Sequence, residues 1–235
     1  MRIIQLSSLF ILVLSIVVSC QKDQPEELVL EYSSLPDIDG NTYKTVKIGN
    51  DWWMCENLKV SHFKDGSALN EVSFSDTATW QGNASFKFFN DSLYGKLYNY
   101  QAVFDTRGLA PEGWHVASDA EWKALEREIG MDSLEAEMFA WRGTNEANLI
   151  LTEGSANWPT ASFHFGSNKY ALAVQPGGIV QIPGLPTANG LEAYFWTATT
   201  QGQEAIYRSL SYQRAQIFRQ KADLRYGMSV RCVKD

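Results

Sequence analysis

The sequence contains few residues of the kinds that bind metal ions or form covalent intermediates. Of its 235 residues, three are histidines and three are cysteines. His62, His115 and His164 stand about fifty residues apart, and neither His-x-x-x-His nor Cys-x-x-Cys spacing occurs. Zinc sites are usually built from more closely spaced ligands. The sequence therefore predicts no metal, no cofactor and no catalytic residues, and we expect a protein that is not an enzyme.

Positive charge is also scarce. The chain has 20 lysines and arginines against 27 acidic residues, a formal net charge of −7. An acidic chain without a basic patch argues against nucleic acid and anionic lipid surfaces as partners. The basic residues of the last third are dispersed among apolar residues at strand-like spacing, which predicts solvated strand faces. They are Arg208, Arg214, Arg219, Lys221, Arg225 and Arg231.

The only long apolar run lies at the N-terminus. Arg2 precedes the apolar residues 9–18, and Ser19 and Cys20 follow. A positively charged start, a short apolar stretch and a small residue at the cleavage site are typical of a secretory signal. The apolar stretch is too short for a stable membrane span. We expect residues 1–19 to be a signal peptide. Its removal takes away Arg2 and moves the formal charge from −7 to −8.

The residues around Cys20 resemble the lipobox of bacterial lipoproteins, with Val17 where leucine is commoner. The resemblance implies that Cys20 is lipidated and becomes the first mature residue; a plain secreted protein is the alternative. Several acyl chains on one residue give stable anchoring. The cluster of lysine and acids within residues 21–27, just after Cys20, resembles the export signal of surface lipoproteins in the Bacteroidetes group. We expect residues 20–36 to be a lipid anchor and flexible tether, and the protein to be attached to the outer membrane and exposed at the cell surface.

No linker divides residues 37–235, which predicts one domain. Residues 37–41 alternate oxygen-bearing side chains as a calcium loop does, but its twelfth position is Ile48 rather than glutamate. A hairpin turn therefore explains this stretch better. Apolar or aromatic runs bounded by turn residues predict further strands. These runs cover residues 43–48, 52–54, 170–174, 194–198, 206–212, 215–219 and 228–233.

The stretch GWHVASDAEWKALE, residues 113–126, predicts a strand, a turn and an amphipathic helix. Ser118 stands three residues before Glu121, the spacing of a capping box. The periodicity predicts helices over about 119–129 and 133–142 and places Trp114 and Trp122 in the core. A ligand-binding role for this stretch is the alternative.

Five ordered blocks of sequence resemble the Fibrobacter succinogenes major paralogous domain, often called FISUMP. They are DIDGNTYKTVKIGNDWWMCENLK, YGKLYNYQAV, GLAPEGWHVASDAEWKALE, FWTATT and YGMSVRCVKD, and together they span residues 37–235. The sequence departs from the family pattern twice. Cys55 replaces the alanine of WMAENL, and Ala110 stands where the family usually has a cysteine before Pro-Glu-Gly-Trp.

The helix start and the final Val-Arg-Cys-Val strand are also similar to the formylglycine-generating enzymes. That likeness implies an α+β, C-type-lectin-like domain with two helices, a twisted antiparallel sheet, long irregular loops and paired chain ends. Formylglycine chemistry needs a late pair of cysteines, which this chain does not have, so the activity is not carried over. With Cys20 lipidated, Cys55 and Cys232 remain as an even pair in an oxidising compartment. We expect a disulfide between them, with two buried free thiols as the alternative.

Tryptophan is frequent, with eight residues. Most occupy periodic or family-motif positions, but Trp80 and Trp158 are expected at the surface, where stacking on a sugar or protein ligand is possible. We expect a non-catalytic binding or adhesion domain for glycans or a protein partner. The alternatives are an enzyme or degenerate enzyme on a formylglycine-type scaffold, and a structural subunit of a surface fibre.

Overall fold

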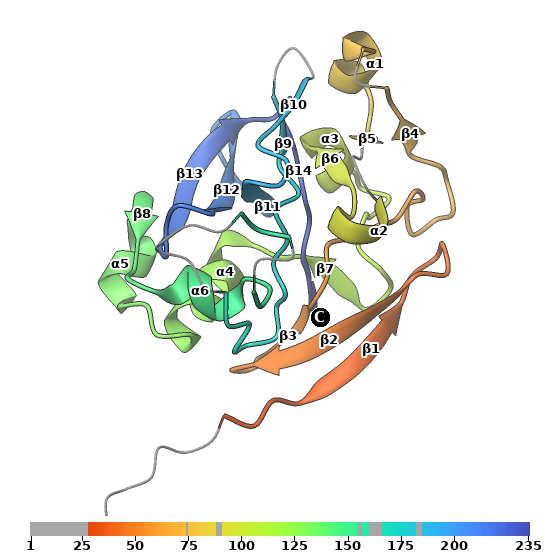
Figure 1. The fold of residues 1–235 in the computed structure, drawn as a ribbon. Helices are drawn as coiled ribbons and strands as arrows, with labels where there is room; N and C mark the ends of the chain where they lie inside the picture. Colours follow the sequence, from red (N-terminus) through yellow and green to blue (C-terminus); the bar gives the residue numbers. More distant parts are fainter. Residues whose placement is uncertain (1–27, 74, 88–90, 155–156, 160–165, 182–184) are drawn as a thin grey trace, which may run out of the picture.

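The computed structural model describes residues 28–73, 75–87, 91–154, 157–159, 166–181 and 185–235. Within these ranges the chain forms mostly antiparallel sheets with short helices between them, which confirms the predicted α+β class (Figure 1). The predicted signal peptide, Cys20 and His164 lie outside the described residues. Among the described helices, none has the length and apolar character that crossing a bilayer requires.

The first sheet joins the two ends of the domain. Its described strands lie in the order β1-β2-β3-β15-β7, and β15 pairs with both β3 and β7. The pairing of chain ends expected from the sequence is thus present (Figure 1). The strands are β1 (Tyr32–Pro36), β2 (Thr42–Ile48), β3 (Asp51–Met54), β7 (Trp114–Val116) and β15 (Cys232–Lys234).

Strand β1 corrects the expected domain boundary. Residues 32–36 were predicted to end the flexible tether, but they pair with β2, and Leu35 is buried opposite Tyr43. The turn that follows is organised by Asp37. Its carboxylate accepts hydrogen bonds from the backbone N–H groups of Asp39 and Asn41, both at 2.9 Å, and from the Tyr43 hydroxyl at 2.7 Å. The hairpin turn is therefore confirmed.

Two further sheets complete the β structure of the described chain. One has the order β10-β9-β14-β6-β5-β4 and the other β11-β12-β13-β8. Residues 170–174, predicted as a strand, contribute only an isolated bridge from Val174 to Leu151. The strands of the second sheet are β4 (Asn70–Glu71), β5 (Ser85–Lys87), β6 (Leu97–Asn99), β9 (Ile179–Gln181), β10 (Leu185–Thr187) and β14 (Gly227–Met228). Those of the third are β8 (Ala140–Arg142), β11 (Glu192–Gln201), β12 (Glu204–Ser211) and β13 (Ile217–Asp223).

The described helices are short, and α4 is the longest. They are α1 (Thr77–Gly82), α2 (Asp91–Tyr94), α3 (Tyr100–Val103), α4 (Asp119–Glu128), α5 (Ser133–Glu137) and α6 (Glu146–Ile150). The helix predicted over 133–142 ends at Glu137, because the residues after it pair with β13 as strand β8. Arg142, at the end of β8, has its side chain in the interior and is 3% exposed.

The predicted capping box at the start of α4 is confirmed. The Ser118 hydroxyl accepts from the Glu121 N–H at 3.2 Å, and the Glu121 carboxylate accepts from the Ser118 N–H at 2.7 Å. These two bonds satisfy backbone donors that the first turn leaves without intrahelical partners. We expect Ser118→Ala to lower the free energy of unfolding by about 1 kcal/mol. Urea denaturation followed by circular dichroism measures it, and a midpoint equal to the wild type would contradict the structural role given to the cap.

Two tryptophans join α4 to the first and third sheets. Trp122 of α4 lies with its ring centroid 5.1 Å from that of Trp53 in β3 and 5.4 Å from that of Phe195 in β11. All three side chains are at most 1% exposed. Trp122 is therefore core, as the helical periodicity predicted, and so is Trp114 at 7% exposure.

Beside these rings the interior holds a charged network that the sequence reading missed. Glu126 of α4 accepts from Arg142 at 2.8 and 2.9 Å and from the Arg208 Nε at 2.6 Å. Asp119 accepts from Arg208 at 2.7 Å and from Arg219 at 2.9 and 2.7 Å. Burial opposes the charged form of Asp119, but the two guanidinium groups hold its pKa down at about 2. We call these five residues the buried ion network.

The burial of three arginines shows that their assignment to solvated faces was wrong. Arg208, Arg219 and Arg231 are 0%, 6% and 1% exposed. Arg231 donates to the Asn57 side chain at 2.7 Å and to the Met54 and Leu172 carbonyls at 2.8 and 2.7 Å. Burial lowers the pKa of its guanidinium to about 10.

The predicted disulfide between Cys55 and Cys232 is not formed, and both are buried free thiols. The pairing of β15 with β3 does bring the two segments together, with Val233 opposite Trp53. Because side chains alternate along a strand, this register places Cys232 and Cys55 on opposite faces of the sheet. Cys232 accordingly packs in one hydrophobic cluster with Met54, and Cys55 packs in another with Trp53. Burial raises the pKa of both thiols, that of Cys55 to about 11.

Candidate functional site

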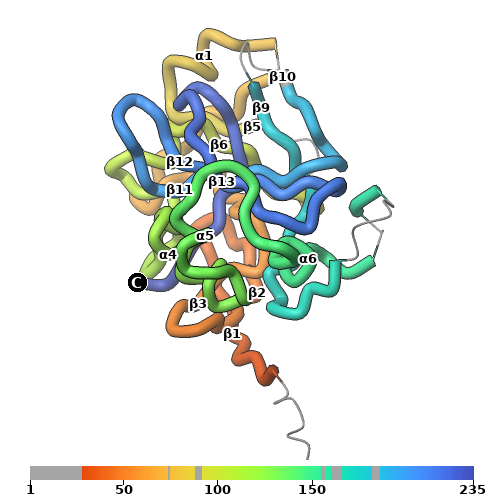
Figure 2. Tube along the Cα trace, turned by 90° about the vertical axis from the view of Figure 1, so that its left-hand side faces the viewer, coloured from red at the N-terminus to blue at the C-terminus, as the bar shows by residue number. Residues whose placement is uncertain are grey.

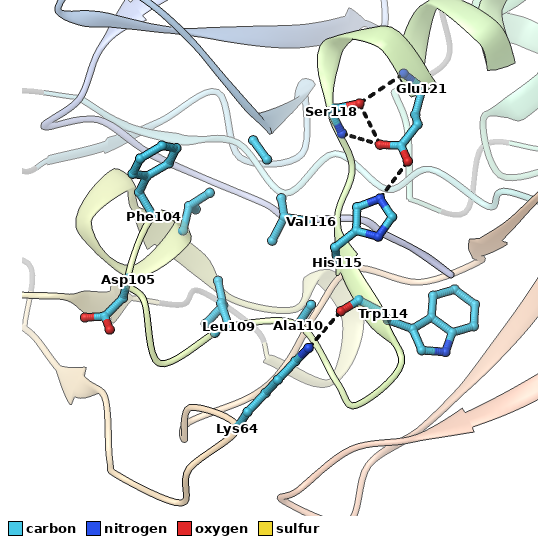
Figure 3. Close-up of a pocket in the computed structure, with 13 residues that line it drawn as sticks. Lys64, Phe104, Asp105, Leu109, Ala110, Trp114, His115, Val116, Ser118 and Glu121 are labelled. Carbon is cyan, nitrogen blue, oxygen red and sulfur yellow. Dashed lines mark hydrogen bonds and ion pairs between the residues drawn. The ribbon is translucent and has the colours of Figure 1, made fainter. Parts of the chain in front are cut away.

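Two adjoining hollows lie on one surface of the domain and share the residues Lys64, Leu109 and Ala110. Their volumes are about 390 and 300 Å³, within the range of small-ligand sites. Figure 3 shows the first hollow, with Phe104 at one end and His115 at the other. We refer to the pair as the Lys64 hollows.

The first hollow has aliphatic walls. It is lined by Val103 at the end of α3, by Leu109 and Ala110 of the following loop, by Val116 of β7 and by Ala198 of β11. Phe104 stands at the rim and is 60% exposed, which is unusual for a ring next to a core. Its inner face stacks on Tyr100 at a centroid distance of 5.5 Å. The hollow therefore offers a recessed apolar surface with one exposed aromatic ring beside it.

Lys64 divides the two hollows and is held at both ends. Its backbone N–H donates to the Gly108 carbonyl at 2.9 Å, and its Nζ donates to the Trp114 carbonyl at 3.0 Å (Figure 3). The side-chain stem passes close to Gly108, where an added Cβ would lie 3.1 Å from the Lys64 Cδ. Gly108 also has a positive φ of 79°, which favours glycine. Glycine at position 108 thus leaves room for the Lys64 side chain to lie across the loop.

A chain of polar groups forms the far rim of the first hollow. The Glu121 carboxylate accepts from the Ser118 hydroxyl at 2.7 Å and lies 2.6 Å from the His115 Nε2 (Figure 3). The His115 Nδ1 lies 2.7 Å from the Asp235 carboxylate. The serine hydroxyl therefore points to a carboxylate and not to the histidine, so this constellation lacks the contact by which a histidine activates a serine nucleophile.

The charges of this rim favour the ionised forms. Burial opposes charge on both His115 and Glu121, but hydrogen bonds raise the pKa of His115 through Asp235 and Glu121 and lower that of Glu121 through Ser118 and His115. Asp105 has a lowered pKa because Arg107 binds it at 2.7 and 2.8 Å. A general acid or base works best with a pKa near neutrality. The carboxylates of the first hollow are shifted away from that range.

The second hollow is bounded by the β1–β2 turn. Asp37 and Ile38 line it together with Val60, His62 and Glu112. Asp37 is occupied by the turn contacts described above. His62 bonds to Asp39, whose pKa burial would raise but which the Ser61 N–H and His62 lower. Across the described residues no group of three His, Cys, Asp or Glu side chains is placed to hold a metal ion.

The two tryptophans expected at the surface are buried, so that expectation was wrong. Trp80 is 1% exposed and donates through Nε1 to the Arg225 carbonyl at 2.7 Å. Trp158 is 6% exposed and donates to the Val174 carbonyl at 3.1 Å. Each indole N–H is satisfied internally, and neither ring offers a face to a ligand. The structure brings together His115, Ser118 and Glu121 of the GWHVASDAEWKALE stretch at the hollow, but Lys64 and Phe104 carried no sequence signal.

The protein is a folded α+β domain with two surface hollows that have the size of small-ligand sites. The chain belongs to the Fibrobacter succinogenes major domain family, Fib_succ_major, which matches residues 46–234. The membership expected from the five sequence blocks is thereby confirmed. No curated protein and no solved structure matches the chain.

The raised pKa of His115 predicts a pH dependence of stability. Protonated His115 binds both carboxylates, so its contribution is fully present below the unfolded pKa of about 6.5 and is lost as the pH rises through the higher folded value. We expect the melting temperature of the wild type to exceed that of His115→Gln at about pH 6 and the gap to narrow towards about pH 9. Paired thermal melts measure the gap. A gap that widens with pH would show that the histidine is bound in its neutral form.

Proposed function

We propose that this chain is a surface-exposed bacterial lipoprotein whose folded domain is a non-catalytic binding or adhesion module. The Lys64 hollows are its ligand site, and an apolar segment of a protein partner is the ligand. We also assign the domain to a C-type-lectin-like architecture, which the paired chain ends and the mostly antiparallel sheets support.

One observation carries the binding role: the hollow has an apolar floor, and its polar rim groups already hold partners within the chain. Lys64 binds the Trp114 carbonyl, Asp105 binds Arg107, and Glu121 binds Ser118 and His115. Such a rim can orient a bound ligand, but it supplies no free base or nucleophile. This favours binding over the rival enzyme, because the carboxylates Asp105 and Glu121 have lowered pKa values and His115 is held between Glu121 and Asp235.

The kind of ligand follows from the walls. Val103, Leu109, Ala110, Val116 and Ala198 are aliphatic and recessed, which suits an inserted apolar side chain better than the flat face of a sugar. Phe104 at the rim adds an exposed ring of the type enriched at interface centres. An apolar side chain of a partner protein that enters the hollow would remove both the aliphatic walls and the Phe104 ring from water.

A hollow-filling variant tests the site. Peptides are selected by phage display on the purified chain, and their affinity is measured by fluorescence polarisation. Ala198→Trp, on the wall of the first hollow, should weaken binding at least tenfold by occupying the space. Thr200→Trp, an exposed position two residues further along β11, is the matched control and should bind as the wild type does. Equal affinity of both variants, or failure to select any peptide, would exclude the hollow as a peptide site.

Anchoring is tested separately. Cys20→Ala removes the thiol that the lipid would modify, so we expect the variant to incorporate no radiolabelled palmitate and to keep its signal peptide or be poorly processed. A retained signal peptide would itself favour a detergent phase through the apolar residues 9–18, so lipid incorporation, which supplies the stable anchor, is the quantity measured. Cys55→Ala, which alters a buried thiol, is the control. Unchanged palmitate incorporation by Cys20→Ala would disprove the lipoprotein assignment.

A further inference from the structure

The second of the Lys64 hollows has apolar walls. Val60, Leu109, Ala110 and Pro111 line it and are buried. Ile38, in the β1–β2 turn, also lines it and is 52% exposed. Walls of this kind favour contact with an aliphatic chain, because the apolar surfaces that meet are removed from water. The hollow therefore suits the apolar part of a ligand.

The two acids that line this hollow, Asp37 and Glu112, are not neutralised within the described part of the chain. Asp37 accepts hydrogen bonds from the backbone N–H groups of Asp39 and Asn41, from the Asn41 amide and from the Tyr43 hydroxyl. These donors are neutral, so the negative charge of Asp37 remains. Glu112 is exposed, and no described lysine, arginine or histidine forms an ion pair with either carboxylate.

The other acids that line the hollows or lie beside them differ in this respect, because each pairs with a base of the same chain. The pairs are Asp105–Arg107, Glu121–His115 and Asp39–His62. Among the described acids at this surface, those without a base are Asp37 and Glu112. Both belong to the second hollow, so uncompensated negative charge is concentrated there.

The bases on the wall of the second hollow do not cancel this charge. Lys64 directs its Nζ to the Trp114 carbonyl at 3.0 Å, and Trp114 lines the first hollow but not the second (Figure 3). His62 binds Asp39 through its Nδ1 and so faces an acid of its own. The second hollow therefore combines apolar walls with a negative potential, which attracts a cationic group.

The second hollow lies at the end of β1 where the chain turns towards β2. Pro36, the last residue of β1, lines it. The described chain begins at residue 28, before the other end of β1, and both views show it entering the domain there from below (Figure 1 and Figure 2). Because a strand rises about 3.3 Å per residue, a membrane anchor upstream of residue 28 would leave the hollow accessible to a partner.

We infer that the second hollow binds a lysine or arginine side chain of the partner segment whose apolar side chain occupies the first hollow. Lysine and arginine have an aliphatic stem and a charged head, so the stem contacts the apolar walls while the head pairs with Glu112. Asp37 acts through its charge, because donors of the turn already occupy its oxygens. The inference rests on the proposed function and narrows the partner to a segment that is both apolar and basic, complementary in charge to this surface.

Peptides selected by phage display on the purified full chain test the inference from the side of the ligand. We expect the peptides that Ala198→Trp weakens to contain a lysine or arginine. Norleucine in place of that base keeps the stem and removes the charge, and it should weaken binding about threefold to tenfold, the range between an exposed and a partly buried ion pair. The affinity of the basic peptide should fall as salt is added, because salt screens exposed charges, whereas the norleucine peptide should respond little.

Substitution of Glu112 tests the same contact from the side of the protein. Glu112→Gln should weaken the basic peptide as much as norleucine does, and should leave the affinity of the norleucine peptide unchanged. Glu204→Gln is the matched control, because Glu204 is exposed in β12 and lies outside the lining of both hollows. Glu112→Lys should prefer a peptide in which glutamate replaces the base. Thermal melting shows that each variant is folded.

The outcomes separate this inference from the proposed function. Peptides that Ala198→Trp weakens, but that bind equally to the wild type and to a folded Glu112→Gln, would overturn the inference and leave the first hollow as a peptide site. Peptides that Glu112→Gln weakens, but that bind Ala198→Trp as they bind the wild type, would disprove the first hollow as a peptide site and with it the joint use of the two hollows.

Discussion

Replacing Glu126 by glutamine is expected to lower the free energy of unfolding by about 3–5 kcal/mol, the usual cost of breaking a buried ion pair from one side. Glu126 is fully buried and neutralises two arginines, Arg142 and Arg208, which are themselves at most 3% exposed. The amide removes the negative charge but leaves both guanidinium groups away from water. Chemical denaturation of wild type and variant at neutral pH measures the difference.

Glu128 supplies the matched control, because it is an exposed glutamate in the same helix. Glu128→Gln should change the unfolding free energy by less than about 0.5 kcal/mol, as exposed substitutions usually do. If Glu126→Gln and Glu128→Gln had the same midpoint, water or another group would have to compensate the arginines. The buried ion network would then not hold α4 to the third sheet.

Trp122→Ala is expected to have an effect of similar size, about 3–5 kcal/mol, through the cavity that the ring would leave. Trp122 contacts both Trp53 and Phe195 and is 1% exposed, and its indole N–H has no hydrogen-bond partner. The side chain therefore acts by volume alone. Trp122→Phe keeps a ring and breaks no hydrogen bond, so it should cost clearly less than the alanine variant.

The same pair of variants decides between the two interpretations of the GWHVASDAEWKALE stretch. Thermal melting and peptide affinity are measured on each. If Trp122→Ala melted like the wild type but lost ligand binding, the tryptophan would belong to a site and not to the core. A large fall in melting temperature with the binding of the folded fraction preserved is the expected result.

Sequence patterns predicted the features whose causes are local. The Asp37 turn, the Ser118 capping box and the burial of Trp122 depend on residues within a few positions of one another, so spacing alone revealed them. Strand 114–116 was likewise found, whereas the pairing of the chain ends was expected only from the resemblance to the formylglycine-generating enzymes. The predicted length of α5 was wrong because residues 140–142 pair with β13 as a strand. A pairing between residues so far apart in the chain cannot be recognised from helical periodicity.

The errors concern contacts between distant residues. Arg208 and Arg219 were assigned to solvent because arginine in a β pattern is usually exposed, but their acids lie 82 to 100 positions earlier in the chain. The disulfide prediction was wrong because the strand register is shifted by one residue from the one that a bridge needs. Cys55 and Cys232 lie in adjacent segments, but their side chains pack into different hydrophobic clusters on opposite faces of the sheet. Neither an arginine's partner nor a strand's register can be read from composition or spacing.

The Lys64 hollows could not be predicted from the sequence for the same reason. Their walls come from the loop around residue 64, the segment 103–110, strand β7 and strand β11. Each segment is unremarkable alone, and the site exists only where they meet. The sequence did single out the stretch with His115, Ser118 and Glu121, but interpreted it correctly as a helix start, and its contribution to the rim became visible only with the fold.

Site-specific photo-crosslinking in the cell tests the central claim, that the first hollow binds a protein partner, most directly. A photoreactive phenylalanine analogue is placed at position 104, on the rim of the hollow, or at position 134 in α5, whose leucine is 80% exposed and lies outside the hollow. The account predicts a discrete crosslinked protein from position 104 that disappears when Ala198→Trp fills the hollow, and no such product from position 134. No crosslink at 104, or the same product from both positions, would contradict it.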